Sequence, residues 1–462
     1  MSDERGQLAH RSPLIIYHSS LMYLLYSFLL TFAILALLPV FLIAALRHGK
    51  YVAGLRQRLG DVPPVDTGGR AVVWLHCVSV GETQAARPLA RTLLERYPTC
   101  ALVVSTTTLT GQKLAHEVFG AEAAAIFYFP FDWAWSVRRS LNKIKPSLVL
   151  VLETELWPRF LRECRRMNVP VALVNGRISE QSFKGYRRVG RFIKSVVGNL
   201  TLGIMQTEAD AARIRALGLA PERIKVAGNV KFDADLTANN QPFTLELRER
   251  FKFNDERPLI VAASTHAPEE FVMLDALRQI CAANHQPRPR LLIAPRHPER
   301  FTEVASLIES SNFSWARRSN VPSVRDHSCD VILLDSIGEL RGVYPLAHLV
   351  FVGGSIARTG GHNVLEPAAA AKCVITGAHT FNFSSIMRDF LEREALTQLP
   401  ALGEAQAAFV LAQLFRELLN DSDRRSRIGE RARAALEESR GATAQTIELL
   451  APLLEQRLER RG

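Results

Sequence analysis

The residues best suited to chemistry are concentrated in one glycine-rich stretch, Val350–Ala370, with the sequence VFVGGSIARTGGHNVLEPAAA. Two glycine pairs, at 353–354 and 360–361, separate an apolar run from an alanine-rich run. Glycines allow backbone N–H groups to approach an anion closely, and a helix start adds about half a positive charge. With Arg358 between the pairs, the stretch predicts a loop that binds a phosphate-bearing ligand. A plain strand-to-helix turn is the alternative.

The helix start after this loop has two interpretations. Asn363 and Glu366 have the three-residue spacing of a capping box, in which both side chains only close the helix start. Pro367 favours a second frame, because proline prefers the first position of a helix. In that frame Glu366 is the cap, and its carboxylate is free to accept hydrogen bonds from a ribose.

A second strand, loop and helix pattern occurs in the first half of the chain, at His76–Ala90 (HCVSVGETQAARPLA). Glu82 lies at its turn, where the helix dipole would favour the ionised carboxylate. The residue either stabilises the helix start or serves as a general base, which must be ionised to accept a proton.

Two further carboxylates, Glu153 and Glu155, follow an apolar run in VLVLETELWP (Val149–Pro158). By the two-residue period of a strand they share one face. Such a pair at the carboxyl end of a strand suits a functional site. The alternative is that either glutamate caps a helix or pairs with an arginine.

Several polar residues adjoin predicted strand ends in the second half of the chain. They are Lys231 in GNVKFDAD, His266 in AASTHAPEE, Arg296 and His297 in APRHPERF, and the DSIGEL turn at 335–340. Each one alone has an ordinary structural explanation. Beside one glycine loop, together they predict an anion-binding site.

These residues need strands and helices to position them. From Ala71 onward, short apolar runs alternate with helical patterns, which is typical of α/β domains with doubly wound parallel sheets. The polar stretch between Lys231 and Pro258 separates two such series. Two similar domains facing a cleft would place ligands at the carboxyl ends of both sheets. The predicted strands are Ala71–Cys77, Ala101–Thr106, Ala124–Phe129, Ser147–Leu152, Val169–Val174, Leu202–Ile204, Leu259–Ala263, Arg290–Ala294, Val331–Leu333, Leu349–Val352 and Cys373–Thr376.

The composition is that of a folded protein, with 47% hydrophobic and 22% charged residues among 462. A net charge of +11 indicates acidic partners: anionic lipid, an anionic substrate or nucleic acid. Nucleic acid is disfavoured, since the sequence has no zinc-finger spacing, RNP-like motif or basic helix. The lack of a dinucleotide fingerprint and a P-loop lysine argues against redox cofactors and ATP hydrolysis. The six cysteines show no paired spacing, which indicates buried free thiols.

The N-terminal region contains no Asp, Glu, Lys or Arg from Ser12 to Leu46. This run is long enough to cross a bilayer, which needs roughly 20 residues, and too long for a cleaved signal peptide. More positive charges follow the run than precede it, so we expect the rest of the chain to be cytoplasmic. Another basic stretch, Val174–Lys194, interleaves arginines and lysines with aromatic residues. It is either a solvated helix face or a surface for phosphates and acyl chains.

Eight motifs in order along the chain resemble those of the 3-deoxy-D-manno-octulosonic acid (Kdo) transferases of bacterial lipopolysaccharide synthesis. They are SVGE, ETELWP, VNGRISEQS, GNVKFD, STHAPEE, PRHPER, DSIGEL and GGHNVLEPA. The resemblance, from about Gly54 to the C-terminal helix, implies the GT-B fold with two Rossmann-like domains facing a cleft. It implies a membrane anchor at 1–50, an acceptor domain at 51–231, a donor domain at 232–420 and a C-terminal helix, 421–462, returning toward the first domain.

The resemblance also implies an inverting transfer of Kdo from CMP-Kdo to the tetraacylated lipid A precursor (lipid IVA) at the inner membrane. Glu82 would be the proton acceptor, and Glu153 and Lys231 would support the transition state. The residues expected to contact CMP are Arg296, His297, Ile337, Gly338, Glu339, Asn363, Val364, Leu365 and Glu366. No cofactor or metal is expected, because arginine, lysine, amides and a helix dipole can meet the charge of the donor.

The sequence departs from the family pattern in three places. The N-terminal extension is longer, Ser336 and Ile337 stand where threonine and methionine are expected, and Arg358 is unusual and could alter donor contacts. Two other classes stay open: a GT-B enzyme that uses a UDP-sugar and a lipid acceptor, and a non-catalytic membrane-anchored protein that binds nucleotide sugars. The intact Glu82 counts against the second.

Overall fold

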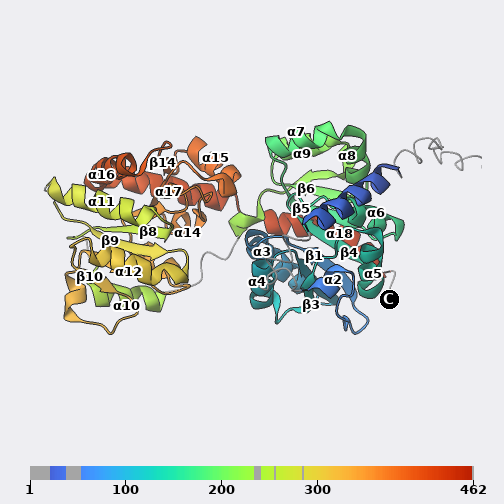
Figure 1. The fold of residues 1–462 in the computed structure, drawn as a ribbon, viewed down its shortest axis with the longest axis horizontal. Coiled ribbons are helices and arrows are strands. Elements are labelled where there is room, and N and C mark those ends of the chain that lie inside the picture. Colours follow the sequence, from blue (N-terminus) through green and yellow to red (C-terminus); the bar gives the residue numbers. More distant parts are fainter. Residues whose placement is uncertain (1–20, 38–53, 234–240, 254–255, 284–285, 460–462) are drawn as a thin grey trace, which may run out of the picture. The chain divides into compact units, whose positions relative to one another are not determined.

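The computed structural model describes residues 21–37, 54–233, 241–253, 256–283 and 286–459 (Figure 1). Met1–Ala234 with Arg440–Gly462 form one compact unit, unit 1, and Asp235–Ser439 form a second, unit 2. The chain therefore passes between the units after 234 and after 439, whereas the sequence analysis divided it after 231 and 420. Each unit has its own seven-stranded sheet, which confirms the prediction of an α/β chain with two parallel sheets.

The sheet of unit 1 is parallel throughout, in the order β3-β2-β1-β4-β5-β6-β7. Its strands are β1 (Ala71–His76), β2 (Cys100–Thr106), β3 (Ala123–Tyr128), β4 (Leu148–Leu152), β5 (Val171–Gly176), β6 (Leu202–Met205) and β7 (Ile224–Val226). The chain winds from β1 outward to β3 and then crosses to β4 on the other side of β1. Open α/β sheets bind ligands at such a reversal, so the candidate crevice of unit 1 lies between β1 and β4.

Helices cover both faces of this sheet. They are α2 (Leu55–Arg58), α3 (Val80–Arg96), α4 (Leu109–Phe119), α5 (Ala134–Ile144), α6 (Pro158–Arg166), α7 (Glu180–Arg188), α8 (Gly190–Val197), α9 (Glu208–Leu217), α18 (Ala442–Glu459), and the 3₁₀ turns η1 (Pro221–Arg223) and η2 (Val230–Asp233). Alternate residues of β1 enter two different cores, Val72 and Trp74 on one face and Val73 and Leu75 on the other. This two-sided burial explains the unbroken apolar runs of the sequence.

The last helix, α18, completes the core of unit 1. Its Ile447 and Leu450 pack in the same cluster as Leu89 of α3. The carboxylate of Asp233 accepts the N–H groups of Gly441, at 2.7 Å, and Thr443 at the start of this helix. These contacts join the end of unit 1's first segment to its second segment.

The sheet of unit 2 is also parallel, but its order, β10-β11-β9-β8-β12-β13-β14, differs from that of unit 1 because β11 lies between β9 and β10. Its strands are β8 (Leu259–Thr265), β9 (Arg290–Pro295), β10 (Trp315–Arg317), β11 (Val331–Leu333), β12 (Leu349–Val352), β13 (Cys373–Thr376) and β14 (Thr397–Gln398). Its helices are α10 (Gln241–Phe251), α11 (Glu269–Ala282), α12 (Phe301–Glu309), α13 (Leu340–Val343), α14 (Leu365–Ala369), α15 (Ser384–Glu392), α16 (Glu404–Asn420) and α17 (Ser422–Glu438), with η3 (Pro298–Arg300), η4 (Val324–His327), η5 (Tyr344–Leu346) and η6 (Phe381–Phe383). The reversal of strand order falls between β8 and β12.

All eleven predicted strands are present, to within a few residues at their ends. The apolar pattern does not predict β7, β10 and β14, which have two or three residues each and lie at the edges of the sheets. Edge strands this short present no apolar run, because half of their surface meets solvent. The expectation of free thiols is confirmed, since all six cysteines are unpaired and five are buried.

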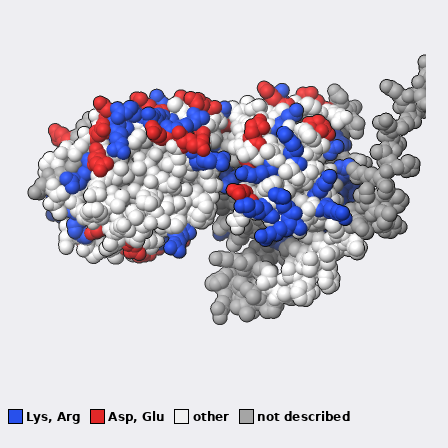
Figure 2. All heavy atoms as spheres, turned by 90° about the horizontal axis from the view of Figure 1, so that it is seen from above, with Lys and Arg blue, Asp and Glu red and all other residues white. Residues whose placement is uncertain are grey.

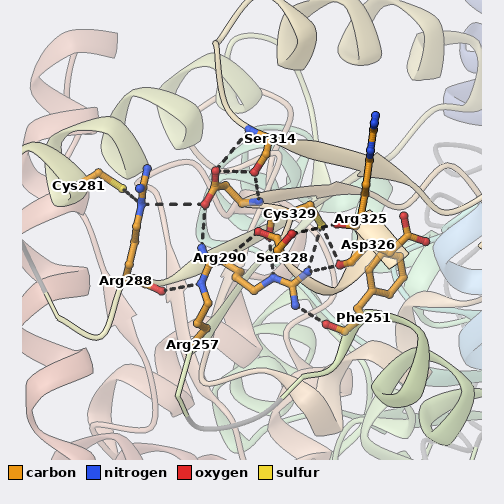
Figure 3. Close-up of polar contacts among 11 residues, drawn as sticks. Phe251, Arg257, Cys281, Arg288, Arg290, Ser314, Arg325, Asp326, Ser328 and Cys329 are labelled. Carbon is orange, nitrogen blue, oxygen red and sulfur yellow. Dashed lines mark hydrogen bonds and ion pairs between the residues drawn. The ribbon is translucent and has the colours of Figure 1, made fainter. Parts of the chain in front are cut away.

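A buried arginine organises the amino-terminal edge of the sheet in unit 2 (Figure 3). Arg290, at the start of β9, donates to the backbone carbonyls of Phe251 (2.5 Å), Asp326 (2.9 Å) and Cys329 (2.8 Å). These acceptors come from separate loops, so one side chain holds them together. Hydrogen bonds to a charged group are the stronger class, about 1.5–3 kcal/mol each.

Residues 21–37 form a helix with two different faces (Figure 1). One face packs on the rest of unit 1. There Tyr23 is buried, Asn199 donates to its hydroxyl (3.0 Å), and Arg159 donates to its carbonyl oxygen (2.7 Å). The other face exposes large apolar side chains, namely Leu21, Leu24, Leu25, Phe28, Leu29, Phe32, Leu35 and Leu37.

The predicted membrane anchor at 1–50 lies largely outside the described residues, at 1–20 and 38–50. Among the residues that the structure describes, no helix has the length and apolar character needed to cross a membrane. The anchor therefore stays a prediction.

Asp132 joins this helix to the globular part of unit 1. Its buried carboxylate accepts the hydroxyl of Tyr26 (2.9 Å) and the N–H groups of Arg159 (2.9 Å) and Phe160 (2.7 Å) at the start of α6. Removing an acceptor from buried donors leaves each of them without a partner, at a cost of about 1–3 kcal/mol per group.

We therefore expect Asp132→Ala to lower the free energy of unfolding of unit 1 by at least about 2 kcal/mol, measured in urea. Asp66→Ala is the control, because Asp66 is exposed and accepts only a local N–H from Gly68. Equal stabilities of the two variants would show that the buried carboxylate does not hold the α6 start.

Candidate active site

The two carboxylates predicted in unit 1 lie on either side of its strand-order reversal. Glu82 is in the first turn of α3, directly after β1, and Glu153 directly follows β4. β1 and β4 are hydrogen-bonded neighbours. The fold therefore brings together two motifs, SVGE and ETELWP, that are about 70 residues apart.

Glu82 is buried and has few hydrogen-bond donors. Its Oε2 accepts the N–H of Val78 (2.8 Å), and its Oε1 accepts the hydroxyl of Ser79 (2.9 Å), the residue that caps α3. Burial raises the pKa of Glu82 to about 7, and the negative charge of Glu153 adds to this rise. The expectation that the helix start favours the ionised form of Glu82 is not met, because desolvation outweighs the helix dipole here. A carboxylate with a pKa near 7 is well matched to general base catalysis.

Lys231 provides the nearest positive charge to these acids. Its ammonium lies 2.6 Å from Oε1 of Glu153, and both side chains are largely buried. Lys231 comes from η2, which is held in place because the side-chain oxygen of Asn175 accepts the N–H of Val230 (3.1 Å). The motifs VNG and GNVKFD thus position the lysine.

The backbone after the end of β4 is irregular where the acids lie. Glu153 has a φ of 54°, in the left-handed region that non-glycine residues rarely adopt, and β4 already ends at Leu152. The expectation that Glu153 and Glu155 share a strand face is therefore wrong. Strained backbone of this kind costs about 1–3 kcal/mol and is concentrated at functional sites.

Glu155 is the third acidic residue of this site, beside Glu82 and Glu153. Burial raises the pKa of Glu155 to about 7, and the charges of Glu82 and Glu153 contribute to the shift. Lys231 pairs with Glu153 and lowers the pKa of Glu82, so it offsets only part of the charge of these three acids. This arrangement favours a site in which one of the acids is protonated and can exchange that proton.

In unit 2 the first part of the glycine loop already holds an anion, the carboxylate of Glu269. Its Oε2 accepts the N–H groups of His266 (2.9 Å) and Gly354 (2.7 Å). Its Oε1 accepts those of Ser355 (2.9 Å), Ile356 (2.8 Å) and Ala357 (3.2 Å). Glu269 is fully buried at the start of α11. Burial raises the pKa of Glu269, while these N–H groups act in the opposite direction.

This finding corrects the prediction for the first glycine pair. The N–H groups after Gly353 do surround an anion, but it is a side chain of the protein and not a ligand phosphate. Gly353 is required because a Cβ there would lie 2.7 Å from Oε2 of Glu269. The signal for Glu269 in the sequence is weak, since two adjacent glutamates at a helix start are common.

The helix start after the loop matches neither predicted frame. α14 begins at Leu365, so Glu366 and Pro367 are its second and third residues. Asn363 accepts the N–H of Leu365 (3.0 Å), and the Glu366 carboxylate pairs with Arg341 (3.1 Å). Glu366 therefore does not cap the helix, and its carboxylate is already paired. The neighbouring residues Val364 and Leu365 are buried.

The turn at 337–339 projects into solvent and is held at both ends. Ile337 is 79% exposed, and Gly338 has a φ of 83° that favours glycine. Glu339 pairs with Arg318 (3.3 Å) and accepts the hydroxyl of Ser336. An exposed apolar tip on a fixed turn can contact a flat ligand such as a nucleobase.

Arg296 and His297 directly follow β9, and both are exposed. Within the described residues Arg296 forms no ion pair, and His297 lies 3.7 Å from the exposed Glu299. Next to them, His266 and His362 share a hydrogen bond (2.8 Å between their Nε2 atoms). Unit 2 thus gathers Arg296, His297, His266 and the later part of the glycine loop at the carboxyl end of its sheet.

The role of Glu269 gives a direct test. In Glu269→Gln one acceptor oxygen becomes an NH₂ donor facing backbone N–H groups. We expect the amides of 354–357 to lose hydrogen-exchange protection and CMP binding to fall, because the loop after them is displaced. The control is Glu270→Gln, which removes a buried ion pair with Arg300 (2.6 Å) but no contact to the loop. Unchanged protection of 354–357 in Glu269→Gln would contradict this role.

Comparisons with known proteins agree with these motifs. The family model described as 3-deoxy-D-manno-octulosonic-acid transferase (kdotransferase) matches residues 53–234. The 3-deoxy-D-manno-octulosonic acid transferase of Haemophilus influenzae is 34% identical over 411 residues, 89% of this chain and 94% of that protein. The enzyme of the same name from Bordetella pertussis is 34% identical over 82% of this chain and 87% of that protein.

Among solved structures, UDP-GlcNAc 2-epimerase from Neisseria meningitidis aligns with a TM-score of 0.55 over 83% of this chain and all of that one. Its identity of 13% shows a common fold alone. The two transferases, in contrast, are similar in sequence over nearly the whole chain. The chain belongs to the family of 3-deoxy-D-manno-octulosonic acid transferases.

Proposed function

We propose that the chain is an inverting, metal-independent glycosyltransferase that moves Kdo from CMP-Kdo to lipid IVA, the tetraacylated lipid A precursor. The observation that carries the mechanism is Glu82, a buried carboxylate with a pKa raised to about 7 at the strand-order reversal of unit 1. Family membership supports the transferred sugar, and the residues of each unit support the division of labour described below.

Glu82 is the general base in this mechanism. It accepts the proton of an acceptor hydroxyl as that oxygen attacks the anomeric carbon of the donor sugar. Attack from the face opposite the departing phosphate inverts the configuration at this carbon. Because two donors from the described part of the chain contact the carboxylate, it keeps lone pairs available for the proton. A positioned base of this kind contributes about 10²–10⁴ in rate.

Lys231 and Glu153 support the same step. The Lys231 ammonium offsets the negative charge of the acids around it, so the ionised form of Glu82 becomes accessible near neutral pH. The contact between Lys231 and Glu153 also fixes η2 relative to the end of β4. Their role is electrostatic support of the transition state.

Unit 2 binds the donor in this proposal. Arg296 and His297 meet the phosphate, the turn Ile337–Glu339 meets the cytosine, and the loop from 360 through Asn363 to Glu366 meets the ribose side. Because Glu269 already fills the first half of the glycine loop, the phosphate depends on Arg296 and not on the amides of 354–357. A sugar acid joined to one phosphate can be held by such donors without a metal.

Unit 1 binds the acceptor. Exposed basic side chains gather on the face of unit 1 seen in Figure 2, and those on α7 and α8 are Lys184, Arg187, Arg188, Arg191 and Lys194. A pocket of about 610 Å³ is lined by Lys184, Arg188 and the polar residues Glu180 and Gln181. These cations suit the two phosphates of the acceptor.

The aromatic residues of this stretch have a different role from the one predicted. Phe183, Tyr186 and Phe192 pack against the core of unit 1 and do not face outward with the basic residues. The apolar surface available to acyl chains is instead the exposed face of the helix at 21–37.

We also propose that residues 1–50 attach the chain to the bacterial inner membrane, with units 1 and 2 in the cytoplasm. Support comes from the apolar outer face of residues 21–37 and from the excess of positive charge after the apolar run. Anionic lipid would further attract the basic face of unit 1.

The base is tested by Glu82→Gln, which keeps the shape of the side chain and removes its basicity. We expect transfer of Kdo to fall at least about a hundredfold, while CMP affinity and folding persist. In the unchanged protein the rate should rise with pH through about 7, as Glu82 loses its proton. Glu153→Gln, measured in parallel, would take over the assignment of the base if its loss of rate were larger.

The pH dependence of thermal stability gives a second test of the raised pKa of Glu82. The folded-state pKa of Glu82 lies above its unfolded value, so wild-type stability falls as pH rises through about 7. The Tm of Glu82→Gln should therefore fall less between pH 5 and pH 8 than the Tm of the wild type. An identical pH dependence of Tm in both proteins would show that Glu82 is not desolvated.

The donor site is tested by Arg296→Ala. Loss of a charged donor should weaken CMP-Kdo binding by about 1.5–3 kcal/mol, or roughly 10- to 150-fold in Kd by calorimetry. Arg325→Ala is the matched control, since Arg325 is exposed on η4. Titration with UDP-sugars in the same experiment separates the proposal from a UDP-dependent relative, which would bind them more tightly than CMP-Kdo.

A further inference from the structure

Two histidines meet end to end at the carboxyl end of the sheet in unit 2. The Nε2 atoms of His266 and His362 are 2.8 Å apart. The two rings are nearly coplanar, with an interplanar angle of 6° and a centroid distance of 5.0 Å. This geometry is that of an N–H···N hydrogen bond, in which one ring donates and the other accepts.

His362 is the fixed partner of the pair. It packs over Gly354, where an added Cβ would lie 3.0 Å from its Nε2, and Gly354 is bound to Glu269. His266 is also fixed, since its backbone N–H donates to Glu269. One buried carboxylate therefore sets the positions of both rings.

Both histidines are held in the neutral form. Burial lowers the pKa of His362 to about 3, and Arg296, His266 and His297 lower it further. Burial also lowers the pKa of His266, as do His297, Arg300 and Arg296, while Glu270 opposes them. A neutral imidazole carries one N–H, so the shared bond fixes where the second ring carries its proton.

The hydrogen bond couples the tautomers of the two rings, because only one of the two Nε2 atoms carries the shared proton. When His362 donates through Nε2, Nε2 of His266 is the acceptor and its proton is on Nδ1. Within the described residues Nδ1 of His266 forms no hydrogen bond, so this N–H is open to a ligand. The ring lies 5.0 Å from that of His297, beside Arg296. An anion at this position favours the tautomer that points N–H toward it.

We propose that His266 is a further catalytic residue, which donates a hydrogen bond from Nδ1–H to the phosphate of the donor as this phosphate leaves. This inference rests on the proposed function. In the transfer step the acceptor oxygen forms its bond to the anomeric carbon, and the bond from this carbon to the phosphate oxygen breaks. The electron pair of the broken bond goes to the phosphate, and the hydroxyl proton goes to Glu82. The leaving phosphate gains a full negative charge, which the His266 N–H and Arg296 stabilise.

His362 is a positioning residue in this scheme. It does not contact the donor but holds His266 in the tautomer with the proton on Nδ1. Preorganised donors aimed at developing charge contribute more to rate than to ground-state binding, because the charge is complete only when the bond has broken. Loss of His266 should therefore affect kcat more than the affinity for the donor.

Two near-isosteric substitutions separate the two nitrogens of His266. The amide of His266→Asn places a donor near the position of Nδ1, whereas the longer His266→Gln places one near Nε2. We expect His266→Ala and His266→Gln to lower kcat about 10- to 100-fold, with the affinity for CMP-Kdo reduced less than threefold. His266→Asn should retain most of kcat. His327→Ala, an exposed histidine of η4, should behave as the wild type.

Two results would overturn the proposal: a normal kcat in folded His266→Ala, or full activity in His266→Gln with loss in His266→Asn. If the variants do not fold, ¹⁵N-histidine NMR of the full wild-type chain gives the answer. His266 should carry its proton on Nδ1, and this resonance should shift when CMP is added. A proton on Nε2, or no shift at saturating CMP, rejects the proposal. Failure of the proposed function is distinct, because then the wild type itself would not transfer Kdo from CMP-Kdo.

Discussion

The buried carboxylate of Glu269 is the constraint on which unit 2 depends. It accepts five backbone N–H groups, from the end of β8 and from the loop after β12. A carboxylate has two oxygens that accept several hydrogen bonds each, and leaving these buried donors unpaired would be costly. Because these segments flank the strand-order reversal, the same interaction fixes the crevice where an open α/β sheet binds its ligand. The His266 and His362 rings take their positions from it.

Glu269 and Glu82 show how the environment divides the roles of two similar residues. Both are buried glutamates in the first turn of a helix that follows the first strand of its sheet. Glu269 is surrounded by backbone N–H donors and has a structural role as their shared acceptor. Glu82 has two donors and acidic neighbours, so its pKa is raised to about 7 and it can exchange a proton. The number of donors aimed at the carboxylate decides between structure and chemistry.

The helix at residues 21–37 is apolar on its outer face and is attached to the rest of unit 1 by polar contacts. Tyr23 and Tyr26 contact Asn199 and Asp132 of unit 1, while the leucines and phenylalanines of the outer face stay exposed. A helix held in this way brings its apolar face into a fixed relation to the basic residues of α7 and α8. In the proposed function these two surfaces match the apolar and the phosphate-bearing parts of the acceptor.

The sequence by itself determined the two parallel sheets, eleven of the fourteen strands and the motifs that identify the family. These features depend on local patterns, since strands buried on both faces appear as apolar runs and functional residues follow them directly. Only the tertiary structure decided how the polar groups pair. It placed Glu269 inside the glycine loop, Arg341 on Glu366 and Lys231 on Glu153, and it raised the pKa of Glu82. Ion pairs, shared hydrogen bonds and desolvation depend on residues far apart in the chain, and no local pattern contains them.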